Sequence, residues 1–329
     1  MAQVETARGP VDADRLGITL MHEHVFVLNE EIRLNYPADW DEEARVADAA
    51  AKLNALQQRG CDTIVDPTVI GLGRDIRRIQ RVAAGTGINI IVATGLYTYD
   101  DVPFYFRYRG AQRQSAGSDP RTALFIADIT EGISGTGVKA AFLKCAIEEQ
   151  GLTRGVERVL RAVAAAHAAT GAPITVHTHP GSESGLAAMR VLAEEGVDLT
   201  RVVMGHSGDA TDLDYLRRLA DAGCLLGMDR FGLNALLPFE QRVDTVAELA
   251  RFGYADRMVL SHDAACYIDW FRPEQIGAFA PDWHFGHLFD DVLPALLERG
   301  VSQAQIETML VDNPRRYFSG PAATAAAGG

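Results

Sequence analysis

The stretch GITLMHEH, residues 17–24, is an apolar run that ends on two histidines separated by one residue. Short apolar runs bounded by turn residues are typical of buried strands. Seven more such runs follow: CDTIVDPT (61–68), INIIVATG (88–95), AAFLKCAI (140–147), APITVHTH (172–179), RVVMGHS (201–207), GCLLGMD (223–229) and DRMVLSHD (256–263). The sequence therefore predicts eight strands, the first of which ends in the histidine pair.

Amphipathic stretches lie between the predicted strands. Residues 41–60 place apolar side chains near helical spacing, and residues 154–171 do the same before ending on a glycine typical of a helix C-terminus. Strands that alternate with helices form parallel sheets. We expect one (β/α)₈ TIM barrel over residues 1–320, with a doubly wound open sheet as the alternative. Residues 321–329 contain little that could pack and are predicted to be a flexible tail.

Composition excludes several classes of partner. The 329 residues include 44 acidic and 31 basic side chains, a net charge of −13, and no basic block, which argues against a nucleic-acid-binding surface. No apolar run approaches the roughly 20 residues that span a bilayer. The N-terminus lacks the layout of a signal peptide, and the four cysteines lie far apart in the chain. We expect a cytoplasmic protein with reduced thiols and no membrane partner.

Metal-capable side chains recur at the ends of the predicted strands: His22 and His24, His177, His206 and Asp263. The carboxyl ends of barrel strands meet at one face, where barrel enzymes keep their active sites. Residues two apart on a strand point to the same side, so both histidines of the first run should face one way and Glu23 the other. A single strand histidine is more often structural, but five such residues together predict a metal site.

Lys144 lies inside the fourth predicted strand, where an unpaired ammonium group is unfavourable. One interpretation is an ion pair with an acidic neighbour. The other is that a neutral, desolvated lysine reacts with carbon dioxide, and that the resulting carbamate bridges two cations.

The ordered motifs resemble those of the phosphotriesterase family of the amidohydrolase superfamily. They are most similar to its phosphotriesterase-like lactonase branch, which includes actinobacterial members labelled as parathion hydrolases. The resemblance runs over essentially the whole chain. It rests on HEH (22–24), LKC (143–145), HTH (177–179), GHSGD (205–209), SHD (261–263), TGLYTYDDVPFYF (94–106), GMDRFG (227–232) and MLVDNPRRYF (309–318).

The resemblance implies a binuclear metal centre. His22, His24 and Asp263 would hold the more buried ion, and His177 and His206 the more exposed one. Carboxylated Lys144 and a hydroxide would bridge the two ions. Zinc is favoured, with cobalt, manganese and iron left open by the ligand types. The hydroxide would attack the substrate while Asp263 takes its proton.

The resemblance also points to residues that contact substrate. Tyr97 matches a tyrosine that faces the metals and the lactone. Arg230 stands where phosphotriesterases proper carry a histidine of a proton relay, and this departure favours a lactonase. Asp209 matches the relay aspartate, but we favour an ion pair between Asp209 and Arg230. Arg230 and Tyr97, with Asp263, are the expected catalytic residues.

Two long connections, residues 96–120 and 264–287, follow strands and are rich in aromatic residues. We expect Tyr97, Tyr99, Arg230, Trp270, Phe271 and Trp283 to bind substrate. The alternative for any of the aromatic residues is a subunit interface. VPFYFRYR (102–109) is apolar enough to predict a homodimer.

The predicted function is hydrolysis of N-acyl-homoserine lactones and other γ- or δ-lactones to hydroxy acids, with weak phosphotriesterase activity. Phosphotriester hydrolysis as the main activity is the alternative. Two other hypotheses are a barrel that binds lactones without turning them over and a mononuclear deaminase, which would not need Lys144.

Overall fold

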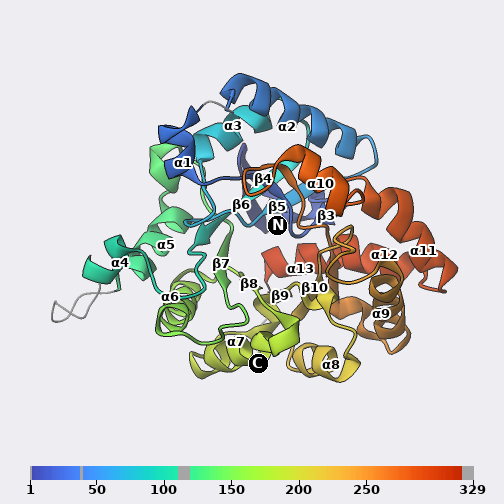
Figure 1. Ribbon diagram of the computed structural model, residues 1–329. Helices are drawn as coiled ribbons and strands as arrows, with labels where there is room; N and C mark the ends of the chain where they lie inside the picture. The colour runs from blue at the N-terminus through green and yellow to red at the C-terminus, as the bar shows by residue number, and fades with distance from the viewer. Residues whose placement is uncertain (1, 38–39, 110–118, 321–329) are drawn as a thin grey trace, which may run out of the picture.

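A ring of eight parallel strands forms the centre of the computed structural model (Figure 1). The structure describes residues 2–37, 40–109 and 119–320. Neighbouring strands follow the order β11-β10-β9-β8-β7-β6-β5-β3. The strands are β3 (Thr19–Leu20), β5 (Thr63–Asp66), β6 (Asn89–Gly95), β7 (Phe142–Ala146), β8 (Ile174–His177), β9 (Val202–Gly205), β10 (Leu225–Met228) and β11 (Met258–Leu260). Each lies within one of the eight predicted runs. The predicted tail, 321–329, lies outside the described residues.

The first and last strands close the ring. Met21 N donates a hydrogen bond to Leu260 O (3.4 Å), and His22 N donates to Ser261 Oγ (2.9 Å). The prediction of a (β/α)₈ barrel, built as one domain, is confirmed.

The first predicted strand is divided in two, which corrects the expectation of one extended strand over residues 17–24. β3 belongs to the ring, whereas β4 (His24–Val27) leaves it and pairs in parallel with β12 (Ala265–Ile268). His22 and Glu23 lie between the two pieces. The backbone changes partners here, because Glu23 N donates to Val65 O (3.0 Å) and His24 N to Ala264 O (2.8 Å).

Helices surround the ring on its outer side (Figure 1). They are α1 (Glu30–Asn35), α2 (Glu42–Gln57), α3 (Ile76–Ala84), α4 (Phe104–Arg109), α5 (Pro120–Thr130), α6 (Arg154–Thr170), α7 (Ser184–Glu194), α8 (Leu213–Asp221), α9 (Phe239–Arg251), α10 (Pro273–Phe279), α11 (Leu293–Glu298), α12 (Gln303–Glu307) and α13 (Asn313–Ser319). Short π-helical segments, Leu288–Val292 and Thr308–Asp312, lead into α11 and α13.

The two predicted helices form where their patterns place them. The side chain of Asp41 caps α2 by accepting a hydrogen bond from Ala44 N (3.1 Å), and α2 buries Ala49, Leu53 and Leu56. α6 ends at Gly171, whose φ of 71° closes the helix. Within the described residues, the two long connections contain secondary structure of their own: α4 in the first, and β12 and α10 in the second.

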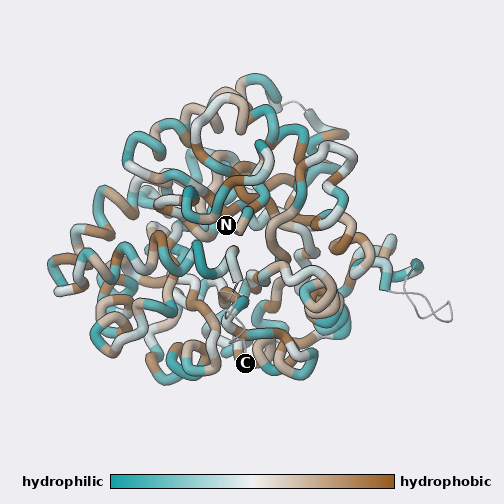
Figure 2. Tube along the Cα trace, turned by 180° about the vertical axis from the view of Figure 1, so that it is seen from behind, coloured by the Kyte–Doolittle hydropathy of each residue, from teal (hydrophilic) through white to brown (hydrophobic). Residues whose placement is uncertain are grey.

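A hairpin plugs one end of the barrel. β1 (Gln3–Thr6) pairs antiparallel with β2 (Gly9–Asp12), and Ala7 N donates to Ile90 O (2.8 Å) near the start of β6. Val4 belongs to the apolar cluster that includes Phe142 and Val203 from the barrel strands. Seen from behind, the N-terminus lies at the middle of the ring (Figure 2). The predicted metal-binding residues lie at the opposite end of the barrel, at the C-terminal ends of the strands.

Among the described residues, no helix combines the length and the apolar character that crossing a bilayer requires.

Candidate metal centre

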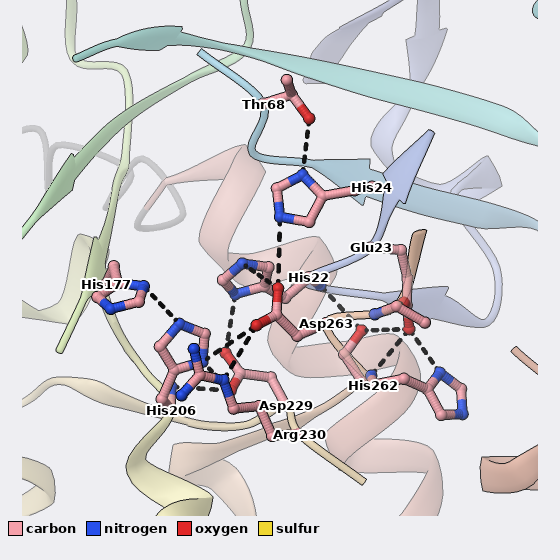
Figure 3. A network of polar contacts seen from close by, with 12 residues as sticks. His22, Glu23, His24, Thr68, His177, His206, Asp229, Arg230, His262 and Asp263 are labelled. Atoms are coloured by element: carbon pink, nitrogen blue, oxygen red, sulfur yellow. Dashed lines mark hydrogen bonds and ion pairs between the residues drawn. The ribbon is translucent and has the colours of Figure 1, made fainter. Parts of the chain in front are cut away.

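Three of the predicted ligands meet above the end of the barrel, and we call them the HEH set: His22, His24 and Asp263. Nε2 of His22 lies 3.2 Å from Asp263 Oδ1, and Nε2 of His24 lies 3.3 Å from the same oxygen (Figure 3). One ligand atom from each residue falls within 4.8 Å of the others. Two imidazole nitrogens and a carboxylate oxygen at this spacing can hold a divalent metal ion.

The remaining two histidines form a second group, the paired-histidine set. His177 ends β8 and His206 follows β9, and Nδ1 of His177 lies 2.8 Å from Nε2 of His206. The imidazoles of the two sets are buried to the same degree, so side-chain burial does not separate a deeper ligand set from a more exposed one.

Asp229 connects the two sets, a role that sequence reasoning missed. Its carboxylate contacts Nδ1 of His22 (2.9 Å) and Nδ1 of His206 (3.0 Å), and it accepts a hydrogen bond from His206 N (2.8 Å). A carboxylate on the second ring nitrogen fixes the orientation of a metal-binding histidine. His22, His206 and Asp229 are also close enough to be ligands themselves. Because Asp229 engages the Nδ1 atoms, Nε2 of His22 remains directed toward Asp263, and Nε2 of His206 toward His177.

Two further polar residues hold the remaining histidines, and neither was predicted. Nδ1 of His24 lies 2.7 Å from Thr68 Oγ1, which donates in turn to Asp66 Oδ1 (2.5 Å). Nε2 of His177 lies 2.6 Å from Glu148 Oε1. The only sequence signal was a polar residue at the end of a predicted run, for Thr68, or just after one, for Glu148.

Lys144 on β7 is fully buried, and within the described residues its Nζ has no hydrogen-bond partner. Burial lowers its pKa to about 8. Burial also lowers the pKa of His22 and, to about 4, that of His177, and the charge of Lys144 adds to both effects. Lys144 therefore acts on both ligand sets. An orphaned nitrogen beside two groups of ligand atoms fits a centre that contains metal ions.

The backbone around the centre is constrained. His206 (φ 65°) and Asp263 (φ 56°) both adopt the left-handed conformation, which is uncommon for residues other than glycine and occurs often at functional sites. Gly95 (φ 148°) passes so close to β7 that a Cβ atom there would lie 1.8 Å from Lys144 O.

The two ligand sets differ in their protonation. Burial alone lowers the pKa of His24, but contacts with Asp263 and Asp66 raise it to about 9. Burial lowers the pKa of His206 well below its usual value. At neutral pH the imidazoles of the paired-histidine set are therefore neutral, whereas His24 is positively charged and would have to lose its second proton to bind a metal ion.

Arg230 and Tyr97 lie next to the ligands. Arg230 donates from Nε to Asp263 Oδ2 (3.0 Å) and from Nη1 to Asp209 Oδ2 (3.0 Å), so the ion pair favoured for Asp209 is present. The hydroxyl of Tyr97 lies 3.2 Å from His177 Nδ1 and forms a short contact with the hydroxyl of Tyr99.

A mostly apolar cavity of about 300 Å³ opens onto these groups. Its wall includes Tyr97, Arg230, Trp270, Phe271 and Trp283, all predicted to bind substrate. Tyr99, which was also predicted to bind substrate, is not part of this wall. A second cavity of about 560 Å³ lies between α2 and residues 264–286. It shares Ala265, Ile268 and Trp283 with the first.

The model of the phosphotriesterase family matches residues 2–318. The chain belongs to the phosphotriesterase family. Members of this family are binuclear metal hydrolases, and the chain is a metal-dependent hydrolase.

Relatives in the phosphotriesterase family match along nearly the whole chain. A phosphotriesterase homology protein of Mycobacterium tuberculosis is 58% identical over 97% of this chain and 98% of its own length. An aryldialkylphosphatase of Saccharolobus solfataricus is 41% identical over 94% of this chain and 97% of its own.

Two solved structures of phosphotriesterase-family proteins share the fold. The M. tuberculosis phosphotriesterase superposes with a TM-score of 0.94 at 58% identity, covering 96% of this chain and 98% of its own. A triple mutant of the organophosphorus hydrolase of Deinococcus radiodurans gives a TM-score of 0.87 at 34% identity, with 97% of each chain covered.

Proposed function

We propose that this chain hydrolyses lactones, opening N-acyl-homoserine lactones and other γ- or δ-lactones to hydroxy acids. The observation that carries the proposal is the division of the cavity wall into a polar end and an apolar remainder. The polar groups of the wall, including Arg230 and Tyr97, gather at the metal-capable end, and apolar side chains line the rest. An acyl lactone has the same division, with a polar ring at one end and an alkyl chain at the other.

The proposed centre holds two divalent ions, zinc first, with cobalt, manganese or iron as alternatives. The HEH set would hold one ion and the paired-histidine set the other. When bound, such ions supply Lewis-acid activation of the scissile carbonyl and of water.

The residues of the chain itself then supply proton transfer and orientation. Burial alone raises the pKa of Asp263, but the hydrogen bond from His24 and the charge of Arg230 hold it well below its usual value. Its carboxylate is thus ionised at neutral pH and can accept the proton that water loses. Arg230 is held beside Asp263 at 3.0 Å, where its guanidinium can donate to the substrate oxygen that gains charge. Tyr97 flanks the same position from the His177 side.

Lys144 is proposed to be carboxylated. The lone pair of its neutral Nζ would form a bond to the carbon of carbon dioxide while the electron pair of one C=O π bond moves to oxygen. The nitrogen would release one proton to water, which leaves an anionic carbamate. Its two oxygens would serve one ligand set each. NMR of protein loaded with ¹³C-bicarbonate should show a carbamate carbon that Lys144→Met lacks. The same spectrum from both proteins would disprove the carbamate.

Kinetics on a series of acyl-homoserine lactones and on paraoxon, with the same metallated enzyme, tests the main proposal. We expect a higher kcat/KM for the lactones. A higher value for paraoxon would instead favour phosphotriester hydrolysis, the activity that the names of the S. solfataricus and D. radiodurans relatives indicate for those proteins. If lactone binds but no hydroxy acid forms, the chain is better explained as a lactone-binding protein. If metal analysis finds one ion per chain, a mononuclear deaminase is favoured.

The acyl groove has its own test. Trp270 lines the cavity and is half exposed, so Trp270→Ala should raise KM for long acyl chains and leave short-chain lactones unchanged. Phe252→Ala is the matched control, because Phe252 is also half exposed but lies outside the cavity wall.

We also propose a homodimer that uses α4. Phe104, Tyr105 and Tyr108 expose more than half of their side-chain surface on this helix. Sedimentation of wild type and Phe104→Ser/Tyr108→Ser should show a dimer that the double variant loses.

A further inference from the structure

Glu23, between the two histidines of the HEH set, has a carboxylate buried completely inside the protein. Figure 3 shows it pointing away from His22 and His24 and toward His262, as the alternation of side chains predicted. A buried carboxylate needs compensating hydrogen bonds. Four donors supply them: Ser261 Oγ (3.0 Å), His262 N (2.9 Å) and His262 Nδ1 (2.6 Å) to Oε1, and Ala264 N (3.0 Å) to Oε2.

All four donors belong to residues 261–264, the turn that contains Asp263. Two of them are the backbone N–H groups on either side of Asp263. Asp263 itself has the left-handed φ of 56°, a conformation that persists only where the surroundings enforce it. The contacts with Glu23 fix the peptide group between Ser261 and His262 and the peptide group that follows Asp263.

We propose that Glu23 is the positioning residue of the HEH set. It holds the turn at residues 261–264 in the one conformation that directs Asp263 toward His22 and His24. The HEH motif thus supplies two ligands by its outer residues and positions the third by its middle residue.

The same contacts extend to the loop beside the cavity. Leu288 N donates to Nε2 of His262 (2.9 Å), so this nitrogen is unprotonated, and Nδ1 carries the proton that is donated to Glu23. Trp283 Nε1 donates to His262 O (2.9 Å). Glu23 therefore aligns, through His262, both the metal-binding turn and the tryptophan on the wall of the cavity.

This inference rests on the assignment of Asp263 as a metal ligand in the proposed function. It does not depend on lactone as the substrate, so the test measures metal binding without substrate. Metal-free wild type, Glu23→Gln, Glu23→Asp and the control Glu131→Gln are titrated with Co²⁺ against a chelator. Their visible absorption spectra and thermal unfolding are recorded in parallel. Glu131 is exposed at the end of α5, away from the centre.

Glu23→Gln should weaken the binding of one Co²⁺ ion about 10- to 100-fold and change its absorption spectrum, because an amide cannot accept at both ends of the turn. Glu23→Asp should not restore binding, since a shorter side chain cannot reach all four donors. Wild-type affinity and spectrum in Glu23→Gln would overturn the proposal. Recovery in Glu23→Asp would do so too, by showing that charge alone suffices.

A second pair of variants applies if Glu23→Gln does not fold. Ser261→Ala and His262→Asn each remove one side-chain contact with Glu23 and keep the backbone donors. Each should weaken Co²⁺ binding by less than Glu23→Gln is expected to, and change the spectrum in the same sense. Unchanged binding and spectra in both variants would overturn the proposal.

Discussion

The HEH set and the paired-histidine set lie side by side, yet they are held in different ways. The groups that orient the HEH set, Glu23, Asp66 and Asp229, are almost completely inaccessible to solvent. His177 of the paired-histidine set is oriented instead by Glu148, whose side chain is 18% exposed. The HEH set is therefore held by buried groups, whereas His177 of the paired-histidine set is held by a carboxylate that solvent reaches. Mutation and pH should act on the two sets unequally.

The largest effect is expected where the two sets meet. Lys144→Met removes the side chain that acts on both sets, so both sets should lose metal. The value of kcat/KM should fall by roughly 10³-fold or more, which corresponds to several kcal/mol of lost transition-state stabilisation. The fold should remain, because the buried Nζ has no hydrogen-bond partner among the described residues and Met fills a similar volume. Metal analysis and calorimetry check this, with Lys139→Met as the control. Retained metal would show that Lys144 is no ligand.

Asp229→Asn should weaken both sets together. Asp229 contacts Nδ1 of His22 and of His206, and loss of such a partner lowers metal affinity about 10- to 100-fold. Chelator competition should show both ions released at lower chelator concentration than in wild type. If only one ion is affected, Asp229 does not couple the sets.

The pH dependence should separate the sets. The pKa of His24 is raised from 6.5 to about 9, so in the metal-free protein its proton stabilises the fold fully below pH 6.5, and this stabilisation is lost as pH rises through 9. Metal must displace that proton, so affinity at the HEH set should rise about tenfold per pH unit between 7 and 9. His177, with a pKa of about 4, is already neutral. Zinc titrations at pH 7, 8 and 9 should show an affinity that rises steeply with pH at the HEH set and an affinity that hardly changes with pH at the paired-histidine set. Two equal slopes would contradict this assignment.

The smallest change should come from Glu148→Gln. Of the four histidines in the two sets, Glu148 contacts His177, at 2.6 Å, and its second carboxylate oxygen accepts from Glu149 N (3.1 Å). Gln can still pack in its place. We expect a loss of metal affinity near tenfold, confined to one ion, and no change at the other. Glu149→Gln, at the exposed neighbouring position, is the control. An effect on both ions would remove the distinction between the sets.

The barrel was predictable because apolar runs of strand length, separated by helical patterns, leave few alternatives. The clustering of the candidate ligands was predictable for the same reason, since His177, His206 and Asp263 come where such runs end. Sequence reasoning treated residues 17–24 as one strand, because the change of partners at His22 and Glu23 depends on contacts with Val65 and Ala264, far away in the chain.

The groups behind the ligands could not be predicted in this way. Asp229 and Glu148 are single acidic residues after strands, and such residues are usually solvated. Tyr99 was expected to bind substrate, but its hydroxyl contacts that of Tyr97 and the residue does not line the cavity. The left-handed backbone of Asp263 likewise has no signature in the residue type, whereas the contacts of Glu23 that enforce it are visible only in three dimensions.

The wall shared by the two cavities has a consequence for redesign of the enzyme. At Trp283 one indole ring, tied to His262 O by its N–H, separates about 300 Å³ on the metal side from about 560 Å³ on the other. The volume on the metal side is thus bounded in part by the three side chains that the two cavities share, Ala265, Ile268 and Trp283. Selection for bulkier substrates can act at Trp283 without altering any strand that carries a ligand.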